Sequence, residues 1–416
     1  MTGIAATPHD APPAAETEPD RLGLMQGFPP PPDRIARVLD GSFRAFPMSR
    51  WSFCNMRQTV PTKNVWRGSG GTVPLPRAEQ DLSDVATVTM DGRPLTFAAA
   101  MAETYADGIL VLHRGRVVYE RYFGALQPHR QHLCMSVTKS FVGALAAALA
   151  VEGVIDPAAP VPRYVPELAA SAFGDATVRQ VMDMTTGLKY TEIYGDPNSD
   201  IARYRLAGSA IRDTAYAGPQ TYYDYLVTLQ KQGEHDAQFT YKTVNTEVLG
   251  WVLRRATGLS LADLVSERLW QQLGCEEDGY FLVDSIGTEG AGGGLNVTLR
   301  DMARFGECMR CGGAFDGRQL LPEAAVADIA GGGDPAKFAP AGYATLPGWS
   351  YRAQWWVAPR DHGAFMARGI HGQSIYVDPR AEMVIARFAS HPLAGNVHND
   401  PVTLPAFMAV AKALTG

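Results

Sequence analysis

An uncharged, Ala-rich run from Phe141 to Val151 constrains the fold more than any other segment of this 416-residue chain. The run is shorter than the about 20 apolar residues that a membrane-spanning helix needs. We therefore expect it to belong to a helix over Met135–Gly153, because Gly is favoured directly after a helix C-terminus. No polar stripe follows Ser140, so this helix should be buried on most of its sides.

Segments with the pattern of β-strands lie on both sides of a long helical region. Ile109–His113 and Arg116–Phe123 flank a turn at Arg114-Gly115 and predict a β-hairpin. Three further strands are predicted over Gln354–Val357, Gly369–Val377 and Glu382–Ser390, followed by a helix over Val402–Leu414. Helices are predicted between these regions over Val178–Met184, Asn245–Thr257, Leu261–Leu273 and Thr298–Met309, the last with Thr298 as its N-cap.

This order of elements predicts an α+β fold, an α/β sandwich in which an antiparallel sheet built from both chain ends is flanked by helices. We expect residues 1–34, rich in Ala, Pro, Glu and Asp, to be a disordered or extended lead-in. Residues 35–159 and 291–416 should form the α/β domain, and residues 160–290 an inserted, mainly helical domain. A cleft between two such domains is a common ligand site.

The composition excludes several classes of function. With 37 Lys and Arg against 43 Asp and Glu, the net charge is −6, which argues against a nucleic-acid partner. The nine histidines form no HExxH motif, and the five cysteines form neither a disulfide framework nor a complete zinc motif, so we expect no metal and no cofactor. Residues 1–10 lack the features of a secretory signal, which favours a cytoplasmic protein without membrane association. The sequence permits a homodimer but does not determine the oligomeric state.

The sharpest chemical signal is Ser136-Val137-Thr138-Lys139 at the start of the buried helix. Residues three apart share a helix face, so the Ser136 hydroxyl and the Lys139 amine can meet. Taken alone, the four residues are better explained by an N-cap Ser with a solvated Lys. However, Lys139 is the only charge between Arg130 and Glu152, and apolar surroundings lower the pKa of a lysine until it can act as a base.

Two further elements could complete a site for nucleophilic catalysis. Tyr241 lies just before a predicted helix and could carry a proton if a cation such as Lys139 or Lys242 lowered its pKa. Gly369–Gln373 lies on a predicted strand, where glycines allow the close approach of another backbone. An N–H of that strand could join the Ser136 N–H in binding an oxyanion. The plainer interpretations are a packed tyrosine and, for His371, a half-buried histidine with satisfied hydrogen bonds.

The order of these elements resembles the serine β-lactamase and penicillin-binding-protein superfamily, and most closely its branch of 6-aminohexanoate-dimer hydrolases and related esterases. The stretches that carry the resemblance are Met135–Ser140, Tyr164–Leu168, Val181–Met184, Asn245–Trp251, Gln354–Trp356 and Ile370–Gln373, in collinear order. The resemblance implies a β-lactamase-like fold and an acyl-enzyme mechanism on small esters or linear amides.

The resemblance also implies roles for individual residues. Ser136 would be the nucleophile, Lys139 its base and Tyr241 the proton shuttle to the leaving group. The backbone N–H groups of Ser136 and Ile370 would form the oxyanion hole. Three residues would bind substrate, namely Tyr194, which closes over it in this branch, His371 and Trp356.

The sequence departs from the pattern of the superfamily in one motif and at three single positions. Ile370-His371-Gly372 replaces the Lys-Thr-Gly motif of β-lactamases, and Thr243 replaces an Asn of penicillin-recognising relatives. Arg205 and Gly292 stand where dimer hydrolases use an Asp and an Asn on the amide substrate. We therefore expect ester cleavage to persist and efficient amide cleavage to be in doubt. A carboxylesterase without amidase activity, a catalytically silent binding protein and an exported cell-wall peptidase remain alternatives.

Overall fold

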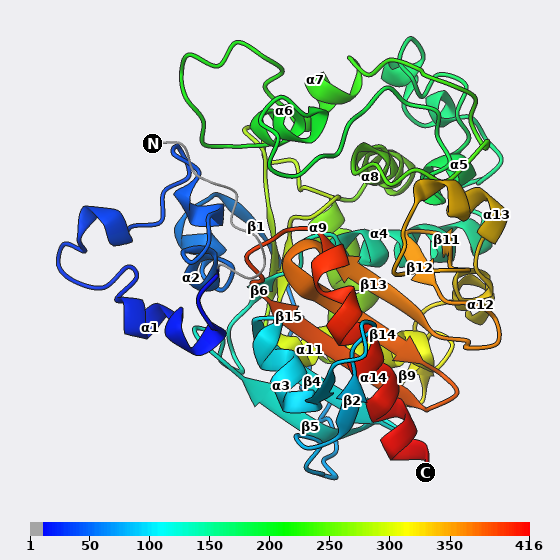
Figure 1. Ribbon diagram of the computed structural model, residues 1–416. Coiled ribbons are helices and arrows are strands. Elements are labelled where there is room, and N and C mark those ends of the chain that lie inside the picture. The colour runs from blue at the N-terminus through cyan, green and yellow to red at the C-terminus, as the bar shows by residue number, and fades with distance from the viewer. Residues whose placement is uncertain (1–10) are drawn as a thin grey trace.

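The computed structural model describes residues 11–416 and is built around a seven-stranded antiparallel sheet in the order β11-β12-β13-β14-β15-β4-β5 (Figure 1). Its strands are β4 (Ala106–His113), β5 (Arg116–Tyr122), β11 (Ser350–Arg352), β12 (Trp355–Val357), β13 (Phe365–Gly369), β14 (Gln373–Asp378) and β15 (Met383–Ala389). Because β15 pairs with β4, the two chain ends share one sheet, as the sequence predicts.

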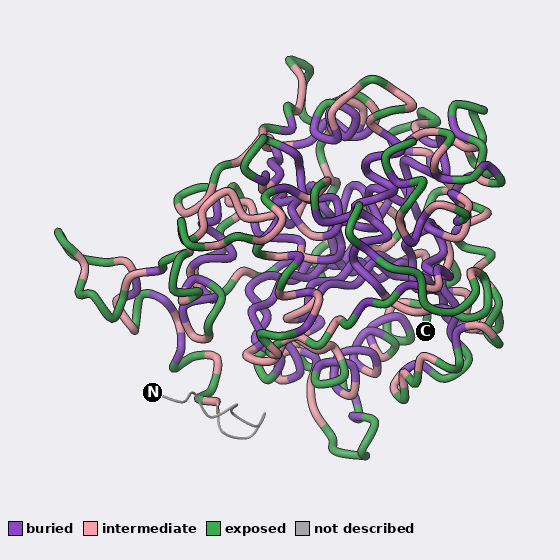
Figure 2. Tube along the Cα trace, turned by 90° about the horizontal axis from the view of Figure 1, so that it is seen from above, coloured by how far each residue is buried: buried purple, intermediate pink, exposed green. Residues whose placement is uncertain are grey.

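Helices cover both faces of this sheet. Alternate residues of β4 face opposite sides: Leu110 and Leu112 join the core formed with α4 (Val137–Val151) and α11 (Leu299–Arg310). Ile109 and Val111 join the core formed with α3 (Phe97–Glu103) and α14 (Asp400–Thr415). Buried residues concentrate in the middle of the molecule between these layers (Figure 2). The predicted α+β sandwich is confirmed.

Helix α4 lies deep inside the molecule, as its composition predicts. All residues from Val137 to Leu149 are buried, and the helix contacts α8 (Val244–Thr257), α12 (Glu323–Gly331) and β13. Gly143 is required at its closest contact, because a Cβ there would lie 2.0 Å from the carbonyl oxygen of Ala353. The small residues of α4 thus let the strands and the helical region approach it from opposite sides.

The region between the two halves of the sheet is mainly helical. It contains α5 (Val178–Met182), α6 (Asp200–Ala207), α7 (Tyr222–Leu226), α8, α9 (Leu261–Val265), a π-helical turn (Ser266–Trp270) and α10 (Gln271–Leu273). Strand β7 (Gly279–Leu282) is the exception, and it pairs in a second sheet of order β1-β7-β8-β6 with β1 (Thr62–Val65), β8 (Leu295–Val297) and β6 (His132–Leu133). These strands have two to four residues, too few for a clear alternating pattern.

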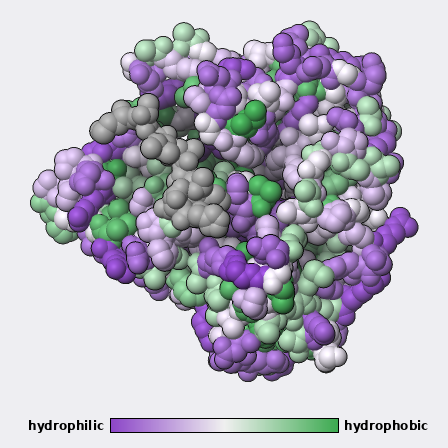
Figure 3. Space-filling model, in the orientation of Figure 1, coloured by the Kyte–Doolittle hydropathy of each residue, from purple (hydrophilic) through white to green (hydrophobic). Residues whose placement is uncertain are grey.

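The remaining elements are short. They are α2 (Ser49–Ser52), β2 (Ala86–Val88), β3 (Pro94–Thr96), β9 (Ala314–Phe315), β10 (Arg318–Gln319) and α13 (Pro335–Phe338), with 3₁₀ turns between them. None of the helices in residues 11–416 has the length and apolar character that crossing a bilayer requires. On the face shown in Figure 3, hydrophobic residues are scattered in small groups among hydrophilic ones.

Residues 11–34 correct the expectation of a disordered or extended lead-in. They form 3₁₀ turns at Ala14–Glu16 and Pro32–Arg34 and the short helix α1 (Pro19–Leu22), at the left of Figure 1. The buried Arg50 guanidinium donates to the Ala14 carbonyl at 2.6 Å and pairs with Asp107 at 3.3 Å. Arg50, which holds this segment, lies outside it in the sequence, so the composition of residues 11–34 does not reveal the contact. Residues 1–10 of the predicted lead-in lie outside the described residues.

Candidate active site

The predicted nucleophile and base meet at the start of α4. The Lys139 ammonium nitrogen Nζ lies 2.9 Å from the Ser136 Oγ, and both residues are buried, with 1% and 9% of their surface exposed. One helical turn between the two residues places them on one face of α4. A charged lysine without a carboxylate partner is costly at such a depth. The geometry thus favours a reactive pair over a solvated lysine.

The surroundings of Lys139 make its amine a usable base. Burial lowers the pKa of Lys139 to about 8, while Glu192 and Glu247 act in the opposite direction and Arg205 reinforces the decrease. At neutral pH a fraction of about one tenth of such a lysine is deprotonated and can accept a proton from the Ser136 hydroxyl. The sequence-based expectation of a lysine with a lowered pKa agrees with this arrangement.

A buried carboxylate that sequence reasoning missed holds the acceptor of Lys139. Lys139 Nζ also donates to the Gly292 carbonyl, and the Gly292 N–H donates to Glu247 Oε1 at 2.7 Å. Glu247 further accepts from the Ala291 N–H at 3.0 Å and from the Tyr204 hydroxyl at 2.6 Å. Glu247 on α8 therefore fixes the glycine-rich loop that orients Lys139. A lone glutamate inside a helix carries no sequence signal for such a role.

Tyr241 lies beside the pair, as predicted, but its pKa is raised and not lowered. Its ring centroid is 5.3 Å from Lys139 Nζ, and the ring stacks on Trp356 at 5.5 Å. Burial, followed by Glu192, raises the pKa of Tyr241 well above its usual value, while the neighbouring Ser136 hydroxyl acts in the opposite direction. Tyr241 is therefore a neutral phenol that can donate a proton. The Lys242 ammonium instead donates to the Leu188 carbonyl, and Lys242 is not among the groups that shift the pKa of Tyr241.

The second predicted oxyanion donor lies in a turn instead of a strand. Residues Ile370–Gly372 form a 3₁₀ turn between β13 and β14, so the predicted strand Gly369–Val377 is wrong over these three positions. A Cβ on Gly369 would lie 3.0 Å from the Ser136 nitrogen and 2.8 Å from the Cys134 carbonyl oxygen. The turn therefore approaches the start of α4 closely. Within residues 11–416, neither the Ser136 N–H nor the Ile370 N–H donates to another residue.

His371 stabilises this turn. It adopts a left-handed backbone (φ 61°), its Nδ1 lies 2.7 Å from the His391 carbonyl oxygen, and its ring packs edge-on against Phe53 at 5.3 Å. Burial lowers the pKa of His371 to about 4, so the ring is neutral at physiological pH. These contacts match the plainer interpretation of a half-buried histidine with satisfied hydrogen bonds, and the assignment of His371 to substrate binding stays a prediction.

Tyr194 lies at the edge of the same site. Its hydroxyl donates to Glu192, whose carboxylate also accepts from the Thr243 N–H and the Thr243 hydroxyl, both at 2.7 Å. Glu192 thus ties the loop that carries Tyr194 to the start of α8, two residues after Tyr241. Arg205 on α6 lies over the Tyr194 ring, with its Cζ 5.3 Å from the ring centroid. The structure therefore brings Tyr194, Tyr241 and Trp356 to one region.

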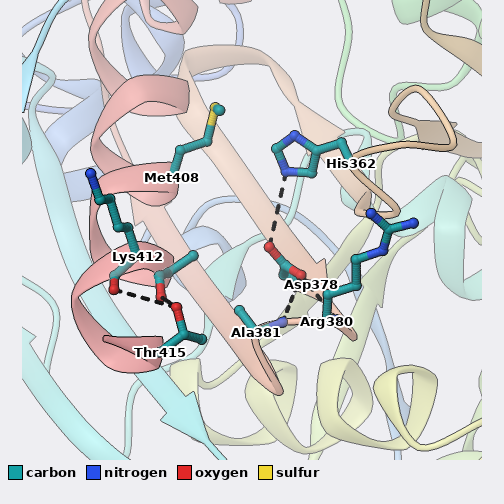
Figure 4. Close-up of a pocket in the computed structure, with 8 residues that line it drawn as sticks. His362, Asp378, Arg380, Ala381, Met408, Lys412 and Thr415 are labelled. Atoms are coloured by element: carbon teal, nitrogen blue, oxygen red, sulfur yellow. Dashed lines mark hydrogen bonds and ion pairs between the residues drawn. The ribbon is translucent and has the colours of Figure 1, made fainter.

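A separate surface pocket of about 390 Å³ lies beside α14, at the far end of the sheet (Figure 4). Its central carboxylate, Asp378, already accepts from the N–H groups of Arg380 and Ala381 and lies 3.9 Å from His362. The pocket therefore offers few unpartnered polar groups. Among residues 11–416, no group of three or more His, Cys, Asp or Glu side chains is arranged to hold a metal ion.

Comparison with known proteins assigns this site to a family. The Beta-lactamase family matches residues 96–401. The chain is 34% identical over 375 residues to the 6-aminohexanoate-dimer hydrolase of Paenarthrobacter ureafaciens, covering 90% of this chain and 93% of that protein. A solved structure from Bacillus anthracis, described as a candidate 6-aminohexanoate-dimer hydrolase, superposes with a TM-score of 0.83 at 32% identity, covering 91% and 97% of the two chains.

A more distant structure shares the fold alone. EstCE1, a hydrolase with promiscuous acyltransferase activity, superposes with a TM-score of 0.58 at 16% identity and covers 76% of this chain and 98% of its own. The family match spans both sequence segments of the large sheet, the helical region between them and the Ser136–Lys139 pair. The chain therefore belongs to the Beta-lactamase family of serine hydrolases.

Proposed function

We propose that this protein hydrolyses small carboxylic esters through an acyl-enzyme on Ser136, with linear amides of the 6-aminohexanoate type as a second, slower class of substrate. The observation that carries the proposal is the 2.9 Å contact between Lys139 Nζ and Ser136 Oγ at a buried position. A buried amine next to a hydroxyl is the arrangement that activates a serine without a histidine.

In the proposed reaction, neutral Lys139 accepts the Ser136 proton as Oγ attacks the substrate carbonyl. The negative charge that develops on the carbonyl oxygen is stabilised by the N–H groups of Ser136 and Ile370. One such donor contributes about 3–4 kcal/mol to transition-state stabilisation. The C–O or C–N bond then breaks, and the acyl group remains on Ser136.

Tyr241 completes the proton transfers. Its phenol, protonated because burial raises its pKa, donates to the departing alkoxide or amine and regains a proton from the Lys139 ammonium. In the second half-reaction, water gives a proton to the same pair and attacks the acyl carbonyl. Ser136 leaves with a proton, and the carboxylic acid is released.

The ester preference rests on the leaving group. A phenolate departs with little help and an alkoxide departs with one proton from Tyr241, whereas an amine, the poorest of the three leaving groups, must be protonated at the moment of bond cleavage. The resemblance to dimer hydrolases implies that Arg205 and Gly292 replace an Asp and an Asn that those enzymes use on the amide. The 34% identity to a 6-aminohexanoate-dimer hydrolase is the observation that keeps the amide class in the proposal.

Intact-protein mass spectrometry during turnover tests this function directly. We expect an acyl adduct on Ser136 with 4-nitrophenyl acetate or butyrate, release of 4-nitrophenolate in a burst, and no adduct in Ser136→Ala. A fluorophosphonate probe should label the unmodified protein and not the variant. Full esterase activity in Ser136→Ala would refute the mechanism, and absence of both adduct and label would favour a silent binding protein.

Comparing the aminohexanoate dimer with the ester panel separates an amidase from a pure carboxylesterase. A location in the cytoplasm is part of the proposal, and cell fractionation tests it against an exported cell-wall peptidase.

A further inference from the structure

Arg205 presents a guanidinium without an anionic partner beside the proposed catalytic residues. It is half-buried on α6, and within residues 11–416 it forms no ion pair or hydrogen bond. Its described contact is the Tyr194 ring, with 5.3 Å between Cζ and the ring centroid. Such a contact holds the planar group in place but leaves its N–H groups available.

The position of Arg205 relative to the site is fixed by its neighbour on α6. The Tyr204 hydroxyl donates to Glu247, the same carboxylate that orients the Gly292 peptide under Lys139. Helix α6 is thereby attached to the loop that positions the base. The charge of Arg205 is close enough to contribute to the lowered pKa of Lys139, which agrees with this placement.

The nearby carboxylates are already occupied by other donors. Glu192 accepts from the Tyr194 hydroxyl and from the N–H and hydroxyl of Thr243. Glu247 accepts from Tyr204 and from two backbone N–H groups. Neither forms an ion pair with Arg205. The arginine therefore has no internal counter-ion among the described residues.

Resting on the proposed function, we infer that the site selects substrates that carry a carboxylate in addition to the scissile ester, and that Arg205 binds this carboxylate. A planar guanidinium can donate two parallel hydrogen bonds to a carboxylate. A neutral ester of the same shape cannot accept these charge-assisted hydrogen bonds, so the anionic substrate has an advantage at this position.

Matched ester pairs test the inference. Mono-4-nitrophenyl adipate, which carries its carboxylate on the acyl side of the scissile bond, is compared with its neutral methyl ester. 4-Acetoxybenzoate, which carries the carboxylate on the leaving group, is compared with methyl 4-acetoxybenzoate. Each kcat/KM is divided by the rate of alkaline hydrolysis. We expect the anionic member of at least one pair to be preferred about tenfold or more, the size of one hydrogen bond to a charged group.

Variants assign that preference to Arg205. The anionic-to-neutral ratio should fall about tenfold in Arg205→Gln, should largely persist in Arg205→Lys, and should be unchanged in Arg203→Gln, which removes an exposed arginine from the same helix. The ratio cancels any change that Arg205 causes through Lys139.

The outcomes separate the two proposals. If the neutral esters are hydrolysed through Ser136 but neither pair shows a preference, the carboxylate inference is refuted and the proposed function stands. An equal ratio in Arg205→Gln and the unmodified protein, or an equal decrease in Arg203→Gln, refutes it as well. If neither member of either pair is hydrolysed, the proposed function fails and this inference fails with it.

Discussion

Replacing Gly369 by Ala isolates the close approach between the β13–β14 turn and the start of α4. The backbone of Gly369 is extended (φ −130°, ψ 152°), so alanine fits its conformation without strain. The new methyl group, however, would lie 2.8 Å from the Cys134 carbonyl oxygen, 3.0 Å from the Ser136 nitrogen and 3.1 Å from the Gln373 Cβ. Relief to ordinary van der Waals distances requires the turn to move by roughly half an ångström.

A movement of that size is enough to impair an oxyanion hole, because its donors must lie within about 2.7–3.1 Å of the oxyanion. Loss of one donor lowers kcat by about 10²- to 10³-fold, so we expect Gly369→Ala to reduce the acylation rate by about 10²-fold. KM should change much less, because the ground-state carbonyl depends less on the donors.

Stopped-flow measurement of the 4-nitrophenolate burst gives the acylation rate separately from deacylation. Gly331→Ala is the matched control, since a Cβ on Gly331 meets no atom within 4 Å. Thermal unfolding of both variants tests whether the fold is kept. An acylation rate within twofold of the unmodified protein, in a folded Gly369→Ala variant, would refute the assignment of this turn to the oxyanion hole.

Three further predictions concern the residues around Ser136. The acylation rate should rise about tenfold between pH 7 and pH 9, with a midpoint near the Lys139 pKa of about 8, because only the deprotonated amine acts as a base; a flat profile in single-turnover assays would contradict this. With an alkyl ester, whose alkoxide needs a proton to leave, Tyr241→Phe should lower kcat by about 10²- to 10⁴-fold. Tyr351→Phe, which removes a buried hydroxyl without a partner from the same aromatic cluster, should leave kcat unchanged. Equal kcat values for the two variants on that ester would exclude Tyr241 as the proton carrier. Glu247→Gln should lower the free energy of unfolding in urea by about 1–3 kcal/mol. The three partners of Glu247 are all hydrogen-bond donors, and the amide nitrogen of glutamine cannot accept from them. A loss of stability no larger than that of Glu323→Gln, at an exposed position, would refute this role of Glu247.

Most of the fold follows from local patterns in the sequence. The hairpin of β4 and β5, the buried helix α4 and the N-cap Thr298 all obey period, turn and capping rules, and the structure has them at nearly the predicted bounds. The helix predicted over Leu261–Leu273 is also continuous, although its middle is π-helical. Within the site, the three-residue spacing of Ser136 and Lys139 was enough to predict that their side chains meet, because both residues lie on one helix turn.

The errors arise where distant residues decide the local structure. Ile370–Gly372 continues an apolar strand pattern, but the left-handed backbone of His371 and its bonds to His391 turn the chain there. Glu192 and Glu247 act through backbone groups far away in the sequence, so no motif identifies them. The order of residues 11–34 likewise depends on Arg50, which the composition of that segment cannot reveal.

The pairing of β4 with β15 determines when, during synthesis of the chain, the site can be completed. A nascent chain that has not yet reached β13 already contains Ser136 and Lys139, but it lacks the Ile370 N–H and the strands β14 and β15 that complete the sheet beside β4. Local helix formation is fast, whereas contacts between distant strands wait for both partners. In the proposed mechanism, Ser136 therefore gains its second oxyanion donor only after nearly the whole polypeptide has left the ribosome.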